Sequence, residues 1–479
     1  MIELRTLGRQ TLVYGLSSAA PQIVGLLTLP VIARVLTTSE YGVLEIAIVS
    51  VGLVGILADL GLSSASQRSF FDYKDAQASE RRNVLTTTFV TTMTAACIVA
   101  GLVLAARAPI ADLLFGTSTE AAVVAWMAVL LVATQLGVFV REVLRLHFWA
   151  SAYLVSSVLA AVLGGVVSVA GVTLLDGGPE AMLAGAVLGA ASGAAFGMVR
   201  ARGRYVGRFS RPELRRMLSY GIPLVPTALS VWALTFVDRL LLEHLGSLSE
   251  VGQYAMANRL ASVLLLAVTA FAIAFSPFAL DLRTRDPERE RAARARVLTV
   301  LITVLALIGT VLSVFARELL AVLAPAFEDA ANTVGLLCLG TLLYGVASVV
   351  MLEISIARRT HIFAVYSTIG AVVNIALNVV LIPPLGTVGA GVATVAAFLV
   401  LATGYWWQAQ KLTRTPYETT TVIELILAAT AVGALGLLPL GALYALVKIA
   451  GVAAFVGWLA VRGLIPLSAL RSNQEAGSA

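Results

Sequence analysis

About fourteen long apolar runs dominate this sequence, and each run predicts one membrane span because a helix needs roughly twenty mostly apolar residues to cross a bilayer. The first six runs lie at 11–36, 42–67, 84–106, 121–143, 152–175 and 181–199. The others lie at 218–242, 253–279, 297–316, 331–356, 362–382, 388–409, 420–437 and 441–464. The sequence therefore predicts an all-α integral membrane protein with about fourteen transmembrane helices.

The composition is consistent with this prediction and limits the possible chemistry. Hydrophobic residues make up 59% of the chain and charged residues 13%, whereas a soluble domain carries roughly a quarter charged residues. Cys97 and Cys338 lie far apart in apolar runs, and the glycine-rich stretches do not have the spacing of a nucleotide-binding loop. We therefore predict no metal and no cofactor. Because no loop is long enough to hold a catalytic domain, the protein is not expected to be an enzyme.

The distribution of arginine predicts the orientation, because cytoplasmic loops retain Lys and Arg. Seven arginines lie between Arg200 and Arg216, and six lie between Arg283 and Arg296. With both segments on the cytoplasmic side, both termini are expected to be cytoplasmic too. We expect the 200–216 segment to fix the topology and contact anionic lipids. A specific binding role for this segment is the alternative.

The two halves of the chain share motifs at matching positions. Tyr14-Gly15, Pro21, Arg34 and Ser39-Glu40-Tyr41-Gly42 recur as Tyr220-Gly221, Pro226, Arg239 and Ser249-Glu250-Val251-Gly252. At a constant offset of 211, Glu142 corresponds to Glu353 and Ser156-Ser157 to Ser367-Thr368. These correspondences favour an internal duplication.

Six helices per repeat is an even number, so both halves enter the membrane from the same side and are related by an axis along its normal. We predict two pseudo-symmetric six-helix bundles around a central cleft, over 1–199 and 217–411. The basic cytoplasmic linker 200–216 joins them. The remaining segment, 412–479, adds two transmembrane helices and a cytoplasmic tail.

The opening segment, YGLSSAAPQIVGLLTLPVIARVLTTSEYGVLEIAIVSVGLVGILADLGL, resembles the first two helices of bacterial oligosaccharide-lipid flippases in the polysaccharide transporter family. That family belongs to the multidrug, oligosaccharidyl-lipid and polysaccharide exporter superfamily. The segment VDRLLLEHLGSLSEVGQYAMANRL resembles the corresponding seventh and eighth helices, and the likeness continues through the turn Pro383-Pro384-Leu385-Gly386. The resemblance covers most of the chain.

This resemblance implies a flippase that moves an undecaprenyl-diphosphate-linked oligosaccharide across the bacterial cytoplasmic membrane by alternating access, for surface polysaccharide biosynthesis. The expected partners are this lipid-linked oligosaccharide, membrane lipids, a polysaccharide polymerase and glycosyltransferases, and no nucleic acid. A multidrug or organic-cation antiporter of the same superfamily and a lipid II flippase are the alternatives. Substrate charge separates the antiporter from the flippase, because a cation exporter needs an acidic cavity.

Arginines within the apolar runs are candidate substrate ligands, because a buried charge in a membrane usually faces a cavity or a partner. Arg259 is predicted to lie near the bilayer midplane, where its planar donors suit a diphosphate. A structural pair with Glu45 or Asp59 is the alternative. Arg34 and Arg239, with Asp238, are predicted to act together at the mouth of the cleft, although snorkelling also explains both arginines.

Four further charged residues are candidates for gating or coupling. Glu142 and Glu353 share a repeat position near the inner ends of their helices and predict an inner gate. The nearby arginines, Arg141, Arg145, Arg358 and Arg359, are their expected partners. A carboxylate that gains and loses such partners could also respond to protons or sodium. Asp59 and Arg68 are predicted either to pair and fix the inner end of the second span or to contact a diphosphate.

Overall fold

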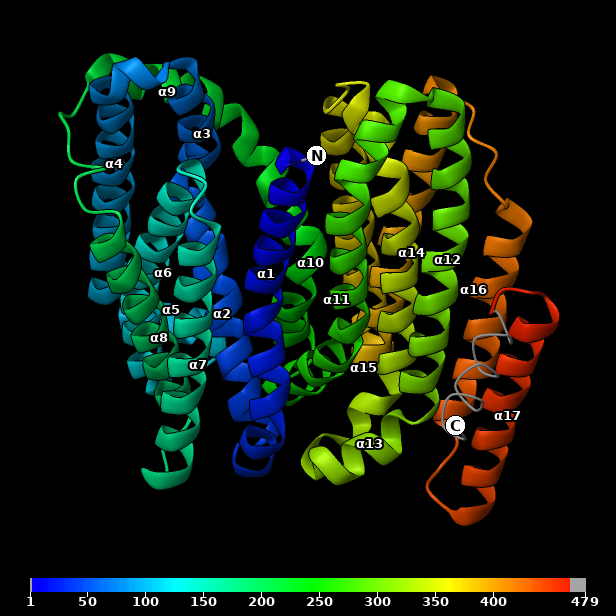
Figure 1. The fold of residues 1–479 in the computed structure, drawn as a ribbon. Helices are drawn as coiled ribbons and strands as arrows, with labels where there is room; N and C mark the ends of the chain where they lie inside the picture. The colour runs from blue at the N-terminus through cyan, green and yellow to red at the C-terminus, as the bar shows by residue number, and fades with distance from the viewer. Residues whose placement is uncertain (1, 466–479) are drawn as a thin grey trace, which may run out of the picture. The chain divides into compact units, whose positions relative to one another are not determined.

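The computed structural model describes residues 2–465, which are helical with no strand in that range (Figure 1). The first ten α-helices are α1 (Ile2–Val35), α2 (Thr38–Asp59), α3 (Leu62–Asp72), α4 (Ala78–Ala105), α5 (Arg107–Phe115), α6 (Ala121–Leu146), α7 (Ala150–Leu174), α8 (Pro179–Arg200), α9 (Arg211–Gly221) and α10 (Val225–Leu245). The remainder are α11 (Leu248–Arg285), α12 (Pro287–Val314), α13 (Ala316–Leu323), α14 (Ala331–Ile356), α15 (His361–Leu412), α16 (Thr419–Gly433) and α17 (Ala442–Val461). Short 3-10 turns lie at Asp75–Gln77, Ser118–Glu120, Ile222–Leu224, Pro325–Ala330 and Ala434–Leu437. The predicted tail beyond residue 465 lies outside the described residues.

Thirteen helical segments among the described residues are long and apolar enough to cross a membrane. One of them, α15, has 52 residues and would measure about 78 Å as a straight helix, far more than the roughly 30 Å of a hydrocarbon core. It is not straight, because Gly386 has a φ of 53° and a ψ of −129°. A Cβ on Gly389 would lie 2.2 Å from the carbonyl oxygen of Leu381, which requires the chain to turn back. The helix is thus two spans joined at the predicted turn, and the predicted fold class is confirmed.

The chain forms two compact units. The first comprises residues up to Ala255 together with Ser367–Ala390, and the second comprises Met256–Tyr366 and the residues from Gly391 onward. Within the first unit, α7 packs along α8, and α6 packs against α4 and α8. Within the second unit, α12 packs against α14 and α16. The boundaries of the predicted repeat domains stay a prediction.

The second predicted span, 42–67, is interrupted. Leu60 and Gly61 both have positive φ, of 52° and 71°, and they separate α2 from α3. At Gly61 a side chain is excluded by space as well as by φ, because a Cβ would lie 2.3 Å from the carbonyl oxygen of Gly221. Asp59, the last residue of α2, accepts a hydrogen bond of 2.6 Å from the hydroxyl of Ser63 in the first turn of α3. This break places a carboxylate beside the start of α3.

The segment 281–296 is helical, although we expected a loop. Helix α11 continues to Arg285 and α12 begins at Pro287, so only Asp286 separates them. The side chain of Asp286 accepts hydrogen bonds from the backbone N–H groups of Glu288 and Arg289, as an N-cap does. The charged residues of this segment therefore lie in the last turns of α11 and the first turns of α12, and not in an extended loop.

The linker 200–216 is held against α4. Thr86 donates a hydrogen bond of 2.6 Å to the carbonyl of Tyr205 and accepts one of 2.7 Å from the N–H of Gly207. The N–H of Ser210 donates to Thr87 at 3.0 Å. Side-chain hydroxyls of α4 thus satisfy backbone groups of the non-helical stretch 205–210 that precedes α9.

The repeated turn motif is a pair of matching helix starts. At the start of α2, Thr37 and Glu40 bond each other's backbone in a capping box. Ser247 likewise accepts a hydrogen bond of 3.2 Å from the N–H of Glu250. The elements that follow also match, because α4 and α12 each have 28 residues and α6 and α14 each have 26. These equalities support the internal duplication.

The two helix starts contact each other within the first unit. The hydroxyls of Thr38 and Ser249 are 2.8 Å apart. A Cβ on Gly42 would lie 1.9 Å from the carbonyl oxygen of Leu248, and one on Gly252 would lie 2.0 Å from that of Thr38. The contact is reciprocal, as expected for a pseudo-two-fold relation between repeat positions. It also explains why both motifs contain glycine.

Candidate functional site

A buried charge cluster surrounds Asp238 and Arg239 in the first unit. Each residue is 2% exposed, and Arg239 donates a hydrogen bond of 2.9 Å to the Asp238 carboxylate. The hydroxyl of Tyr254 donates to the other carboxylate oxygen of Asp238. Glu45 lies 3.9 Å from the guanidinium group of Arg239. In this conformation Tyr254 and Glu45 surround Asp238 and Arg239, the pair predicted to bind substrate. These contacts suit a role in positioning α10 relative to α11.

The other two arginines predicted to bind substrate have more accessible positions. Arg34 is exposed in the last turn of α1. Arg259 is half-buried and lies eleven residues after the start of α11 at Leu248, about 16 Å along the helix axis. A guanidinium group at that depth is held by polar surroundings. Both residues remain candidate ligands.

Glu353 lies in a buried ion-pair network of the second unit. Arg283 donates hydrogen bonds of 2.7 and 3.1 Å to its carboxylate, Arg294 donates one of 2.5 Å and Thr413 one of 2.6 Å. Glu290, which is fully buried, lies 3.2 Å from Arg294 and 3.4 Å from Arg283. The positive charges of Arg283 and Arg294 thus compensate the negative charges of Glu290 and Glu353. The network fastens α11, α12 and α14 to the α15–α16 connection.

The partners of Glu353 differ from those expected. We expected Arg358 or Arg359, which are close in sequence, but the structure supplies Arg283 and Arg294 from α11 and α12. Arg294 is fully buried, although its place in an Arg-rich segment suggested a cytoplasmic loop. The nearby Tyr417 is also enclosed, and burial raises the pKa of its phenol to about 12, so it stays neutral.

Glu142 has a much simpler environment than its repeat counterpart. Arg145 contacts one of its carboxylate oxygens at 2.5 Å, which agrees with one of the expected partners. The other oxygen, Oε1, is buried with no hydrogen-bond partner among the described residues. Asp59 bonds Ser63, whereas Arg68 lies over the ring of Tyr220 at 4.7 Å. Asp59 and Arg68 therefore have separate partners.

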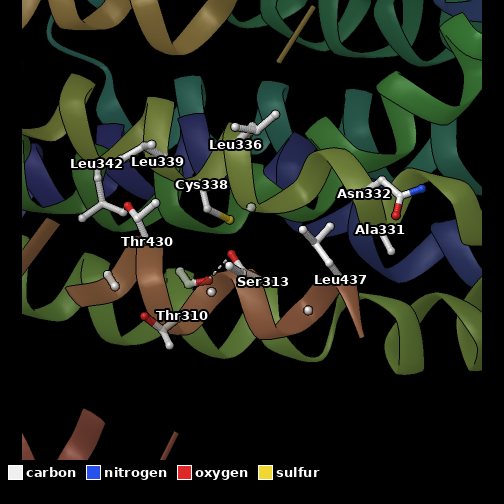
Figure 2. Close-up of a pocket in the computed structure, with 16 residues that line it drawn as sticks. Thr310, Ser313, Ala331, Asn332, Leu336, Cys338, Leu339, Leu342, Thr430 and Leu437 are labelled. Carbon is white, nitrogen blue, oxygen red and sulfur yellow. Dashed lines mark hydrogen bonds between the residues drawn. The ribbon is translucent and has the colours of Figure 1, made fainter. Parts of the chain in front are cut away.

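A cavity lies in the second unit among α12, α14 and α16 (Figure 2). Its volume is about 140 Å³, and no acidic or basic side chain is among its described lining residues. Leu336, Leu339 and Leu342 line it from α14, and the Ser313 hydroxyl is occupied by a 2.6 Å hydrogen bond to the carbonyl of Gly309. The lining suits an apolar group and not the charged end of a ligand.

Sequence reasoning missed two groups of residues. The arginines Arg283 and Arg294 were counted only as topogenic charges, and Tyr254 was not considered as a partner of Asp238. A sequence signal existed for the first group, since a lone glutamate inside an apolar run needs a buried cation. No pattern in the sequence identifies which cation that is.

The fold is shared with flippases and drug transporters of the superfamily named above. A structure titled "Lipid II flippase MurJ, inward closed conformation" matches with a TM-score of 0.73 and 13% identity, over 95% of this chain and 100% of that chain. An inward-facing multidrug resistance MATE family transporter matches with a TM-score of 0.69 and 16% identity, over 84% of this chain and 99% of that chain. An outward-facing MATE family transporter matches with a TM-score of 0.58 and 16% identity, over 88% of this chain and 96% of that chain. At these identities the likeness establishes the fold.

The family follows from the sequence. The model of the family described as polysaccharide biosynthesis protein matches residues 7–279, more than half of the chain. The chain therefore belongs to this family, and it is a multi-pass membrane protein. The resemblance drawn from the opening motifs is confirmed at the level of the family and the fold. No curated protein matches the sequence.

Proposed function

We propose that this protein carries an undecaprenyl-diphosphate-linked oligosaccharide from the inner to the outer leaflet of the bacterial cytoplasmic membrane by alternating access. The family match over 7–279 carries the proposal, because a polysaccharide biosynthesis protein made of membrane helices handles glycan at a lipid bilayer. The fold shared with a lipid II flippase supports it. A polymerase and glycosyltransferases are the proposed partners, since they would use and supply the substrate.

Arg259 is the proposed ligand for the diphosphate, because its guanidinium group can donate paired, charge-assisted hydrogen bonds to phosphate oxygens. We expect Arg259→Ala to abolish glycan export and Arg259→Lys to retain part of it, since lysine keeps the charge but not the planar fork. Complementation of an export-deficient strain, with the amount of inserted protein measured, checks this. Arg34→Ala, at the other candidate ligand, is expected to cause a smaller loss, and Arg107→Ala, exposed at the start of α5 and outside the candidate site, is the control with unchanged export. Normal export by Arg259→Ala at normal protein levels would remove Arg259 from the site.

The same assay separates the proposed function from the antiporter alternative. A flippase restores surface glycan to the deficient strain and leaves drug resistance unchanged. Raised resistance to organic cations without restored glycan would establish the alternative. Restored peptidoglycan synthesis in a strain lacking its lipid II flippase would instead identify lipid II as the substrate.

The proposed orientation places both termini and the linker 200–216 in the cytoplasm. Its seven arginines motivate this. We expect a single cysteine at the exposed position Arg202 to be labelled by an impermeant thiol reagent only in broken cells, in a background lacking Cys97 and Cys338. A cysteine at Asp176, between α7 and α8, should be labelled in intact cells. The opposite pattern would invert the topology.

A further inference from the structure

A small polar cavity lies inside the first unit, where α2, α3, α4 and α6 meet. Two carboxylates line it, those of Asp59 and Glu142. Its volume leaves room for about one water-sized species. It is distinct from the apolar cavity of the second unit, and the export mechanism proposed above makes no use of it.

The polar groups around this cavity present mainly acceptor atoms. Ser66, Thr88 and Thr92 donate their hydroxyl hydrogens to backbone carbonyls of their own helices, at 3.0, 3.0 and 2.9 Å. Ser63 donates to Asp59 at 2.6 Å, and the amide of Gln135 donates to the carbonyl of Gly55 at 2.7 Å. The hydroxyl hydrogens of Ser63, Ser66, Thr88 and Thr92 are therefore used, so the lone pairs of these oxygens remain available to a ligand. Val138 and Phe139 also line the cavity, but its polar side chains present mainly oxygen acceptors, which suit a hard cation.

The charges around the cavity do not balance. Glu142 is 9% exposed, and its Oε1 atom has no hydrogen-bond partner in the described part of the chain. Its charged neighbours are Arg145, whose side chain is 47% exposed, and Asp59. Two carboxylates against one guanidinium group leave one negative charge, and an uncompensated charge inside a membrane protein is costly. One additional positive charge would neutralise the site.

The second half of the chain provides an internal comparison. At the offset of 211 that relates Glu142 to Glu353, Thr88 and Thr92 correspond to Thr299 and Thr303. Thr303 donates to the carbonyl of Thr299 at 2.8 Å, as Thr92 does to Thr88. Around Glu353, however, the guanidinium groups of two arginines supply the positive charge.

At this offset, the positions of those arginines are not basic in the first half. The positions equivalent to Arg283 and Arg294 are Asp72 and Asn83. The second repeat thus has an arginine at each of these two positions, whereas the first repeat has an aspartate and an asparagine. In the first half one guanidinium group, that of Arg145, stands against the two carboxylates of Asp59 and Glu142.

We propose that the cavity binds one monovalent cation of the size of sodium between Asp59 and Glu142, with the hydroxyl oxygens completing its ligands. A bound proton would supply the same charge, but it would engage only one or two of the acceptors. Any use of this ion to drive export rests on the function proposed above. Binding itself does not, so it can be measured without the lipid-linked substrate.

The test uses the purified full-length chain in lipid nanodiscs. Sodium chloride is titrated against choline chloride at constant ionic strength, and the unfolding temperature is followed by tryptophan fluorescence. A ligand that binds only the folded state raises this temperature in a saturable way. We expect saturation by sodium in the parent protein and a rise of about tenfold or more in the half-saturating concentration for Glu142→Gln and Asp59→Asn.

Thr92→Val and Thr303→Val form a matched pair, because each removes a hydroxyl that bonds the carbonyl four residues earlier. We expect weaker sodium binding for Thr92→Val and a change of less than about twofold for Thr303→Val. An unchanged half-saturating sodium concentration in Glu142→Gln, or no sodium effect in the parent, overturns the proposal. So does an effect of pH alone that Glu142→Gln removes, which would identify a proton as the occupant. Loss of binding with intact glycan export would leave the proposed function standing.

Discussion

A disulfide between Thr38→Cys and Ser249→Cys is expected to abolish glycan export, and a reductant is expected to restore it. The two hydroxyls are 2.8 Å apart, and the backbones of α2 and α11 touch at Gly42 and Gly252. This proximity is compatible with a disulfide, which needs Cα atoms about 4.4–6.8 Å apart. Alternating access requires contacts that close one side of the pathway to open in the other state. A covalent link across this contact would hold one state permanently.

The measurement is glycan export before and after oxidation, with the cross-linked fraction determined on gels. Cys97 and Cys338 are first replaced by alanine, and each single cysteine variant serves as a control. Gly42→Leu tests the same contact from the other direction, because a side chain there meets the Leu248 carbonyl and forces the helices apart. Full export by completely cross-linked protein would mean that this contact stays closed throughout the cycle.

Glu353→Ala is expected to destabilise the second unit severely, by about 3–5 kcal/mol, because it leaves buried arginines without their partner. The carboxylate accepts three charge-assisted hydrogen bonds from Arg283 and Arg294. Glu424→Ala is the matched control. Its partner Arg462 is equally close, at 2.5 Å, but both side chains are at least 35% exposed, and surface pairs contribute roughly 0–1 kcal/mol. The temperature of irreversible unfolding in detergent, with the yield of monodisperse protein, measures both effects.

A double variant shows whether unpaired charge is the cause. Glu353→Leu with Arg294→Leu removes one charge of each sign and leaves Arg283 beside Glu290, which are 3.4 Å apart. We expect this variant to recover much of the stability that Glu353→Ala loses, since a buried ion pair can often be replaced by apolar residues. Equal destabilisation by the single and double variants would point instead to lost packing.

Features governed by neighbouring residues were predictable from the sequence. The apolar runs gave the spans, the Pro383–Gly386 segment gave the reversal in α15, and the proximity of Glu142 to Arg145 gave their contact. Contacts between distant segments were not predictable in this way. Glu353 lies 70 residues from Arg283 and 59 from Arg294, and only the packing of α11, α12 and α14 selects them.

The interruption of the second span had a visible but ambiguous cause in the sequence. Leu60-Gly61 follows Asp59, and a glycine inside an apolar run is tolerated in many membrane helices. The break depends on the close approach of Gly221, a residue 160 positions later. Hydropathy indicates only whether a segment favours lipid. It cannot distinguish one continuous helix from two helices separated by residues with positive φ, such as Leu60 and Gly61.

The ion-pair network also sets an order of events during biosynthesis. Arg294 is synthesised 59 residues before Glu353, and at 5–20 residues per second this interval lasts about 3–12 s. During that time the α11–α12 hairpin has two arginines near its polar end and only Glu290 from the network. The arrival of α14 completes the charge balance, and the Thr413 hydroxyl follows 60 residues later. The nascent chain therefore passes through a stage at which α11 and α12 are synthesised but their arginines still lack the Glu353 carboxylate.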